Sequence, residues 1–182
     1  MVILEDTRQQ DGKHDHKHRW FTEHGIEVRR TKLYVGDYTL PTNQSICIDT
    51  KKDFQEIINN LTGNKKDKNG ETEHDRLVKE AERAREAGIS LIYLIENEGG
   101  EVRHGTGIYN PVITRLEDVH KWKNPRLFIM DHGRQKYPRA TRGITLQKML
   151  YTFAEHHGCT FMFCHPTDAA KKIIELLGGD HA

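Results

Sequence analysis

The stretch VGDYTLPTNQSICIDTKKDF, residues 35–54, decides which fold and chemistry we expect of this chain. It opens with an acid in a glycine-marked turn, Gly36-Asp37-Tyr38, and the apolar run 46–48 that follows predicts a strand. That strand ends in Asp49-Thr50-Lys51. Because residues two apart on a strand share a face, Asp49 and Lys51 should point the same way. Two carboxylates that can hold a divalent cation, with an ammonium group beside them, are typical of phosphodiester hydrolysis.

Composition limits the class of protein. The 182 residues suffice for one domain with its own core, and 30% charged residues favour a soluble globular protein. The formal net charge of +1 means that any nucleic-acid affinity must come from local basic patches. Three cysteines in apolar stretches, without a C-x-x-C pair, favour buried free thiols in a reducing compartment. The N-terminus lacks the apolar h-region of a signal peptide and no apolar run approaches membrane-spanning length, so we expect a cytoplasmic protein without a membrane partner.

Strand and helix patterns alternate along most of the chain. Short apolar runs predict strands at 2–4, 26–33, 34–40, 45–51, 89–96 and 159–164. Helical spacing predicts helices at 13–24, 53–61, 72–87, 144–157 and 168–177, and a short one at 113–122. This alternation indicates an α/β fold around a mixed sheet, in which we expect the first three strands to form mostly a meander.

These pieces, in this order, resemble the nuclease domain of the XPF/Mus81 family, often called the ERCC4 domain, a branch of the PD-(D/E)xK nucleases. Four landmarks carry the resemblance: Asp6-Thr7-Arg8-Gln9 after the first strand, Gly36-Asp37-Tyr38, Asp49-Thr50-Lys51, and Arg76-Leu77 before the strand that ends in Ile95-Glu96. The resemblance covers residues 1–98 and 143–178. It implies a single domain over 1–182 with an insertion around 99–143, built on a restriction-endonuclease-like core of a mixed β-sheet flanked by helices.

The chain departs from the family pattern in three places. Asp49 stands where the family has glutamate, and Thr50 stands where it has arginine, which removes one cation from the site. Asp53 is a candidate for the aspartate that often follows the lysine, although its spacing is shorter. The helix-hairpin-helix domain that often follows is absent from the sequence, so we expect a stand-alone nuclease domain, as a phage or an archaeon would carry.

The expected chemistry is metal-dependent hydrolysis of DNA by an endonuclease. Asp37, Asp49 and the backbone carbonyl of Thr50 would hold Mg²⁺ or Mn²⁺. Asp6 would complete the site or bind a second ion, and Lys51 would orient water or stabilise the transition state. The resemblance implies structure-selective cleavage of branched or flap DNA, in repair, recombination or phage DNA processing. It also implies a homodimer or a related partner subunit.

Several basic residues are expected to contact DNA phosphates or to anchor the acids. Arg8 and Arg76 lie in the family landmarks, although Arg76 could instead pair with Glu80 along its helix. Two polar segments either contact the DNA backbone or are merely exposed: Lys65, Lys66 and Lys68 in one, and Arg134, Lys136 and Arg139 beside Tyr137 in the other.

Two questions stay open at this point. The histidines at 14, 16 and 18 could form a metal cluster, but a polar helix face is the better interpretation, since no cysteine is near. The chain could also be a non-catalytic DNA-binding scaffold with a degenerate nuclease fold, which only Thr50 favours, or an RNA-directed nuclease. Retention of Asp6, Asp37, Asp49 and Lys51 together favours an enzyme.

Overall fold

The computed structural model describes residues 1–8 and 15–178. Six strands form one sheet in the order β10-β5-β4-β3-β1-β2. Their bounds are β1 Val2–Asp6, β2 Glu27–Thr31, β3 Tyr38–Thr39, β4 Ile46–Lys51, β5 Ser90–Glu96 and β10 Thr160–Cys164. The helices around it are α1 Asp15–Glu23, α2 Phe54–Thr62, α3 Glu73–Glu86, α4 Gly143–His157 and α5 Ala169–Leu176. The predicted mixed α/β fold is thus confirmed.

The sheet mixes parallel and antiparallel pairs. β4, β5 and β10 run parallel to one another, β3 is antiparallel to both of its neighbours, and β1 pairs with β2 in parallel. The expected meander of the first three strands is therefore wrong. The reason is that α1 carries the chain back over the sheet, so β2 starts at the same end as β1, as in any strand–helix–strand crossover.

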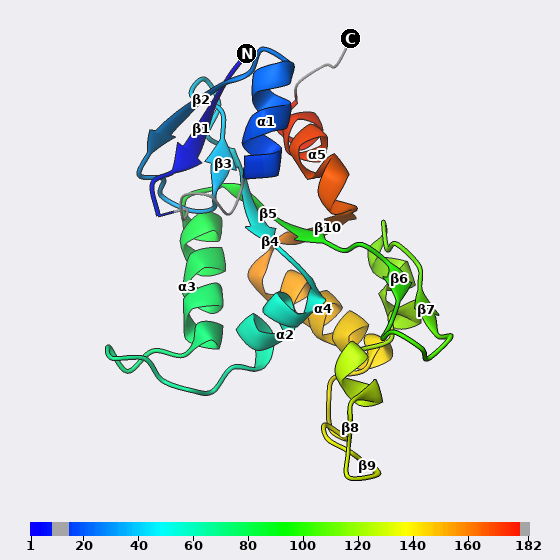
Figure 1. Cartoon of the computed structure of the whole chain (residues 1–182). Coiled ribbons are helices and arrows are strands. Elements are labelled where there is room, and N and C mark those ends of the chain that lie inside the picture. The colour runs from blue at the N-terminus through cyan, green and yellow to red at the C-terminus, as the bar shows by residue number, and fades with distance from the viewer. Residues whose placement is uncertain (9–14, 179–182) are drawn as a thin grey trace.

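Helices cover both faces of the sheet. Figure 1 shows α1 and α5 on one side and α2, α3 and α4 on the other. Each face of the sheet has its own apolar core, and alternate residues of β4 point into one or the other. Cys47 packs with residues of α2, α3 and α4, and Ile48 packs with residues of α1 and α5. Asp49 and Lys51 continue the face of Cys47, so the fold delivers both to the side covered by α2 and α3.

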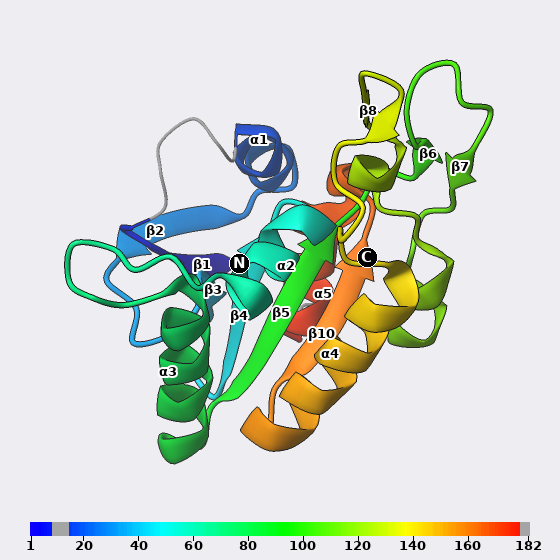
Figure 2. The ribbon, with the colours of Figure 1, turned by 90° about the horizontal axis from the view of Figure 1, so that it is seen from below.

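Residues 99–142 form two small hairpins and two short 3-10 helices, which project beside α4 (Figure 2). Their bounds are β6 Gly100–Glu101, β7 Tyr109–Asn110, η1 Leu116–Lys121, η2 Pro125–Phe128, β8 Met130–Asp131 and β9 Arg134–Gln135; a third 3-10 turn, η3 Pro166–Asp168, precedes α5. The helix predicted at 113–122 is shorter and is a 3-10 helix. The buried amide of Asn97 fastens this segment to β10, because it donates to the carbonyls of Ile113 (2.9 Å) and Cys164 (3.3 Å) and accepts from the Ile113 N–H (2.7 Å).

The three cysteines are buried free thiols, as predicted. Over residues 1–8 and 15–178, the longest helices are too short or too polar to cross a membrane.

Candidate active site

Asp37 is held where β1 and β4 approach each other. Its N–H donates to the carbonyl of Ile48 (2.7 Å), and its carbonyl accepts from the N–H of Asp6 (2.8 Å). The preceding Gly36 has φ +69°, and a Cβ at this position would lie 3.0 Å from the Ile48 carbonyl oxygen. Glycine is therefore required here both for the left-handed backbone and for the close approach of β4.

Asp49 and Lys51 lie together at the end of β4, as the period-two argument predicts. The Lys51 Nζ is 2.5 Å from Asp49 Oδ1, and Asp49 is 6% exposed. Asp49 Oδ1 has no aligned hydrogen bond within the described residues, so the ion pair with Lys51 is its main compensation. Lys51 also sits 5.6 Å above the ring of Tyr93, the residue opposite Asp49 on β5.

Thr50 joins the two acidic positions. Its N–H and its hydroxyl both donate to Asp37 Oδ2, each at 2.8 Å. The side chain that stands where the resemblance leads us to expect arginine thus fixes the orientation of Asp37. Its backbone carbonyl as a metal ligand stays a prediction.

The surroundings of Asp37 and Asp49 disfavour the charged form of both carboxyl groups. Burial, helped by the charge of Asp49, raises the pKa of Asp37 to about 7. Burial also raises the pKa of Asp49; the Lys51 ammonium opposes that rise, and the nearby Glu80 carboxylate adds to it. Burial works against the Lys51 ammonium, but the charges of Asp49 and Asp37 outweigh it and raise the pKa of Lys51 above its usual range. The protonated, cationic form of Lys51 is therefore favoured.

Asp6 has a different environment from Asp37 and Asp49. Its Oδ1 accepts from the backbone N–H (2.7 Å) and Nε (2.8 Å) of Arg8, and its Oδ2 accepts from an Arg8 terminal nitrogen (2.7 Å) and the Leu33 N–H (2.9 Å). Although burial acts against the charge, the hydrogen bonds from Arg8 lower the pKa of Asp6. Each oxygen carries two bonds, so Asp6 would have to exchange partners to bind an ion. Its catalytic role stays a prediction.

One cleft of about 970 Å³ gathers these residues. Asp6, Arg8, Asp37 and Asp49 line it together with Thr50 and Lys51. The other predicted basic residues lie elsewhere. Arg76 lines an adjoining groove, whereas Lys65, Lys66, Lys68, Arg134, Lys136 and Arg139 are exposed and are not among the residues that line the cleft.

The donor set suits a hard divalent cation. Asp37 and Asp49 supply carboxylate oxygens, and Asp49 Oδ1 is a buried acceptor that lacks an aligned donor. Within the described ranges, no group of three or more histidine, cysteine, aspartate or glutamate side chains is arranged to hold a metal ion. Two carboxylates are enough for Mg²⁺, which commonly keeps several waters and takes its remaining ligands from substrate phosphate.

Comparison with known families agrees with this arrangement. The model of the ERCC4 domain matches residues 6–177. The chain belongs to the ERCC4-domain family. Solved structures similar to this ERCC4 domain include XPF from Aeropyrum pernix (16% identity, TM-score 0.56) and the same protein in complex with DNA (18% identity, TM-score 0.57). In each case 97% of this chain is covered, but only 63% of the XPF chain. No curated protein matches the sequence.

On the other wall of the cleft, α1 of this ERCC4 domain does more than present a polar face. Lys17 is buried, with its Nζ 2.5 Å from Glu96 Oε1, and the His16 Nε2 is 3.7 Å from Glu96 Oε2. His18 bonds Glu5 Oε1 (2.7 Å), which also accepts from the Tyr38 hydroxyl (2.8 Å). The polar side of α1 is thus partly internal, and His16 and His18 reach different carboxylates. His14 lies outside the described residues.

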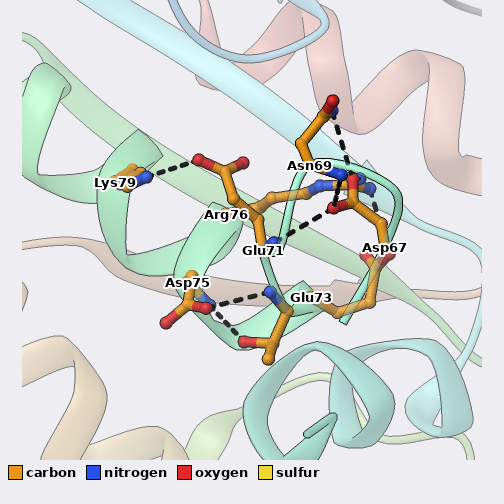
Figure 3. Close-up of polar contacts among 8 residues, drawn as sticks. Asp67, Asn69, Glu71, Glu73, Asp75, Arg76 and Lys79 are labelled. Carbon is orange, nitrogen blue, oxygen red and sulfur yellow. Dashed lines mark hydrogen bonds and ion pairs between the residues drawn. The ribbon is translucent and has the colours of Figure 1, made fainter. Parts of the chain in front are cut away.

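The Lys-rich loop before α3 is stabilised by hydrogen bonds and ion pairs of its own side chains (Figure 3). Asp67 Oδ1 accepts from the N–H groups of Asn69 (2.8 Å) and Glu71 (3.0 Å), and its other oxygen pairs with Arg76. Arg76 also contacts Glu73 at 3.1 Å. The alternative pairing of Arg76 with Glu80 is therefore wrong. Asp67 and Glu73 bind the guanidinium on the N-terminal side of Arg76, whereas Glu80 lies one turn toward the C-terminus of α3.

Glu80 is the residue that sequence reasoning missed. From α3 it reaches into the cleft, where its Oε1 accepts from the Gly36 N–H at 3.0 Å. It lies one helical turn beyond Arg76 and Leu77, so its side of the helix was predictable. Its position against Asp37 and Asp49 depends on how α3 packs on the sheet, which no local pattern records.

Proposed function

We propose that this ERCC4 domain is a metal-dependent DNA endonuclease of the DNA-repair type, selective for branched or flap DNA. The observation that carries the proposal is the convergence of Asp37, Asp49 and Lys51 in one cleft at the end of β4. Family membership supports a nuclease, and one similar XPF structure is a complex with DNA. Recombination and phage DNA processing are further settings that the same chemistry serves.

Asp37 and Asp49 would hold Mg²⁺ or Mn²⁺, with the Thr50 carbonyl as a further oxygen ligand. The bound cation would polarise the scissile phosphate and lower the pKa of a water molecule. Thr50 keeps the Asp37 carboxylate in place through its two donors. Lys51, as an ammonium group, would stabilise the negative charge that develops on the phosphate oxygens as water attacks. Hydrolysis would leave a 5′-phosphate and a 3′-hydroxyl.

The substrate would be held by cations outside the catalytic pair. Tyr137 lies close to two of them, with the Arg126 guanidinium at 5.8 Å and Lys136 Nζ at 5.7 Å from its ring centre. Arg126 also lines the cleft, so the 126–139 segment could continue a DNA-binding surface from the active site. Lys65, Lys66 and Lys68, which are exposed on the loop before α3, would add weak phosphate contacts. A homodimer or partner subunit would extend the surface further.

Cleavage assays test the proposal directly. Labelled flap, fork, Holliday-junction and linear DNA, and an RNA duplex of the same sequence, are incubated with Mg²⁺, Mn²⁺ or EDTA. Asp49→Asn and Lys51→Ala should each lose at least about a hundredfold in rate, whereas Lys148→Ala, on exposed α4 surface, should cut like the wild type. A wild-type protein that binds DNA but cuts none of these substrates would instead be a scaffold, and preferential cutting of the RNA would identify an RNA-directed nuclease.

A further inference from the structure

A second groove, of about 360 Å³, opens into the catalytic cleft along α3. The two share five lining residues: Arg8, Lys51, Asn60, Glu73 and Glu80. The groove continues past them to Arg76, Lys79 and Arg83. Residues 76, 79 and 83 are three, four and seven positions apart, so they share one face of α3. We call this the α3 groove.

Most charged side chains of the α3 groove have a partner, and Glu80 and Arg83 are the two without an ion pair within residues 1–8 and 15–178. Glu73 pairs with Arg76, Glu71 pairs with Lys79, and Glu80 accepts from the Gly36 N–H. Arg8 forms an ion pair with Asp6, and Lys51 forms one with Asp49. Arg83 is half-buried, and within residues 1–8 and 15–178 it has neither an ion-pair nor a hydrogen-bond partner. The Arg83 guanidinium nitrogens are not among the buried polar atoms that lack a partner, so the group is reached by solvent and can receive an anion without first breaking an ion pair.

The simplest alternative is that Arg83 serves the helix itself. It lies in the last turn of α3, where a cation interacts favourably with the helix dipole. Arg85 lies in the same turn and has the same benefit, but it faces α4 and donates to the His156 carbonyl (3.2 Å). Arg83 and Arg85 therefore distinguish the two explanations. The helix dipole stabilises both arginines, whereas only Arg83 lines the α3 groove.

We propose that the α3 groove binds the sugar–phosphate backbone of one substrate strand next to the cleavage site, with Arg83 as its distal phosphate contact. This inference rests on the proposed nuclease function and adds the path of the strand. Seven residues of helix from Arg76 to Arg83 span about 10 Å, which corresponds to about three nucleotides at 3.4 Å each along a B-form strand. The planar guanidinium can bond two phosphate oxygens at once.

Binding is measured by fluorescence anisotropy with a labelled single-stranded oligonucleotide in EDTA, over a series of salt concentrations. Arg83→Gln keeps much of the side chain's apolar stem and removes the charge, so it should weaken binding about tenfold. It should also flatten the slope of log affinity against log salt by about 0.7, the value for one lost phosphate contact on a single strand. Arg85→Gln should stay within about twofold of the wild type, and Arg83→Lys should keep the wild-type slope.

Equal losses in Arg83→Gln and Arg85→Gln, or an unchanged salt slope in Arg83→Gln, would refute the α3 groove. Thermal unfolding of both variants shows whether a loss of affinity arises from a loss of the folded state. If Arg83→Gln does not fold, the salt slope is measured on Arg83→Lys instead. Because binding is measured without divalent ions, the result is independent of turnover. A protein that binds through Arg83 but cuts nothing would refute the nuclease and leave the groove. A protein that cuts, and whose Arg83→Gln variant binds normally, would refute only the groove.

Discussion

Replacing Asp37 by asparagine should make the protein more stable in the absence of divalent ions. In the folded protein, burial raises the pKa of this carboxyl group to about 7, from 3.8 in a model peptide. The difference of about 3 pKa units corresponds to about 4 kcal/mol at 1.36 kcal/mol per unit. Asparagine has nearly the same shape, and its Oδ1 can still accept from both donors of Thr50. The variant therefore removes the cost of burying a charge and keeps the hydrogen bonds.

The pH dependence follows from the direction of the shift. A group whose folded pKa is raised contributes stability that is fully present below its unfolded pKa and is lost as the pH rises through its folded pKa. For Asp37 that window lies between about pH 4 and pH 7. The variant has no such loss. Its advantage over the wild type should be near zero at pH 3.5, about 1.5 kcal/mol at pH 5 and about 4 kcal/mol at pH 8.

The assay is urea unfolding of both proteins at these three pH values in EDTA, with Asp131→Asn as a control at an exposed acid. Addition of Mg²⁺ should then stabilise the wild type more than the Asp37→Asn variant, because only the wild type keeps both proposed ligands. A variant that is less stable than the wild type at pH 8, or a difference between the two that does not change from pH 3.5 to pH 8, would refute the reasoning.

Three further substitutions have expected outcomes. Thr50→Val removes the hydroxyl that bonds Asp37 and should lower the cleavage rate about tenfold, at about 1.4 kcal/mol for one bond to a charged group, with Thr50→Ser restoring it. Gly36→Ala forces φ +69° on alanine and brings its Cβ against the Ile48 carbonyl, so urea unfolding should show a loss of about 1–3 kcal/mol. Asn97→Ala leaves backbone groups of Ile113 unpaired, so hydrogen exchange of the Ile113 amide should accelerate by at least about tenfold.

Local patterns in the sequence predicted most of the secondary structure and the core of the site. The spacing of Asp49 and Lys51 was sufficient to place them on one face, since strand geometry repeats every two residues. The pairing of β2 was not predictable in this way, because a crossover helix and a meander leave similar local patterns. Glu80 and the Arg76–Asp67 pair were missed for a related reason: both depend on contacts between elements, and Asp67 is nine residues from Arg76.

The substitution at position 50 has a consequence for the charge of the whole site. Asp37, Asp49 and Glu80 bring three carboxylates into the cleft, where Lys51 pairs with Asp49 and Arg8 is bonded to Asp6. Threonine supplies two donors to Asp37 but no positive charge. Since burial already raises the pKa of both Asp37 and Asp49, the charge that arginine would have provided has to come from elsewhere. A divalent cation can supply it, so we expect Mg²⁺ or Mn²⁺ to stabilise this ERCC4 domain as well as to serve the proposed cleavage.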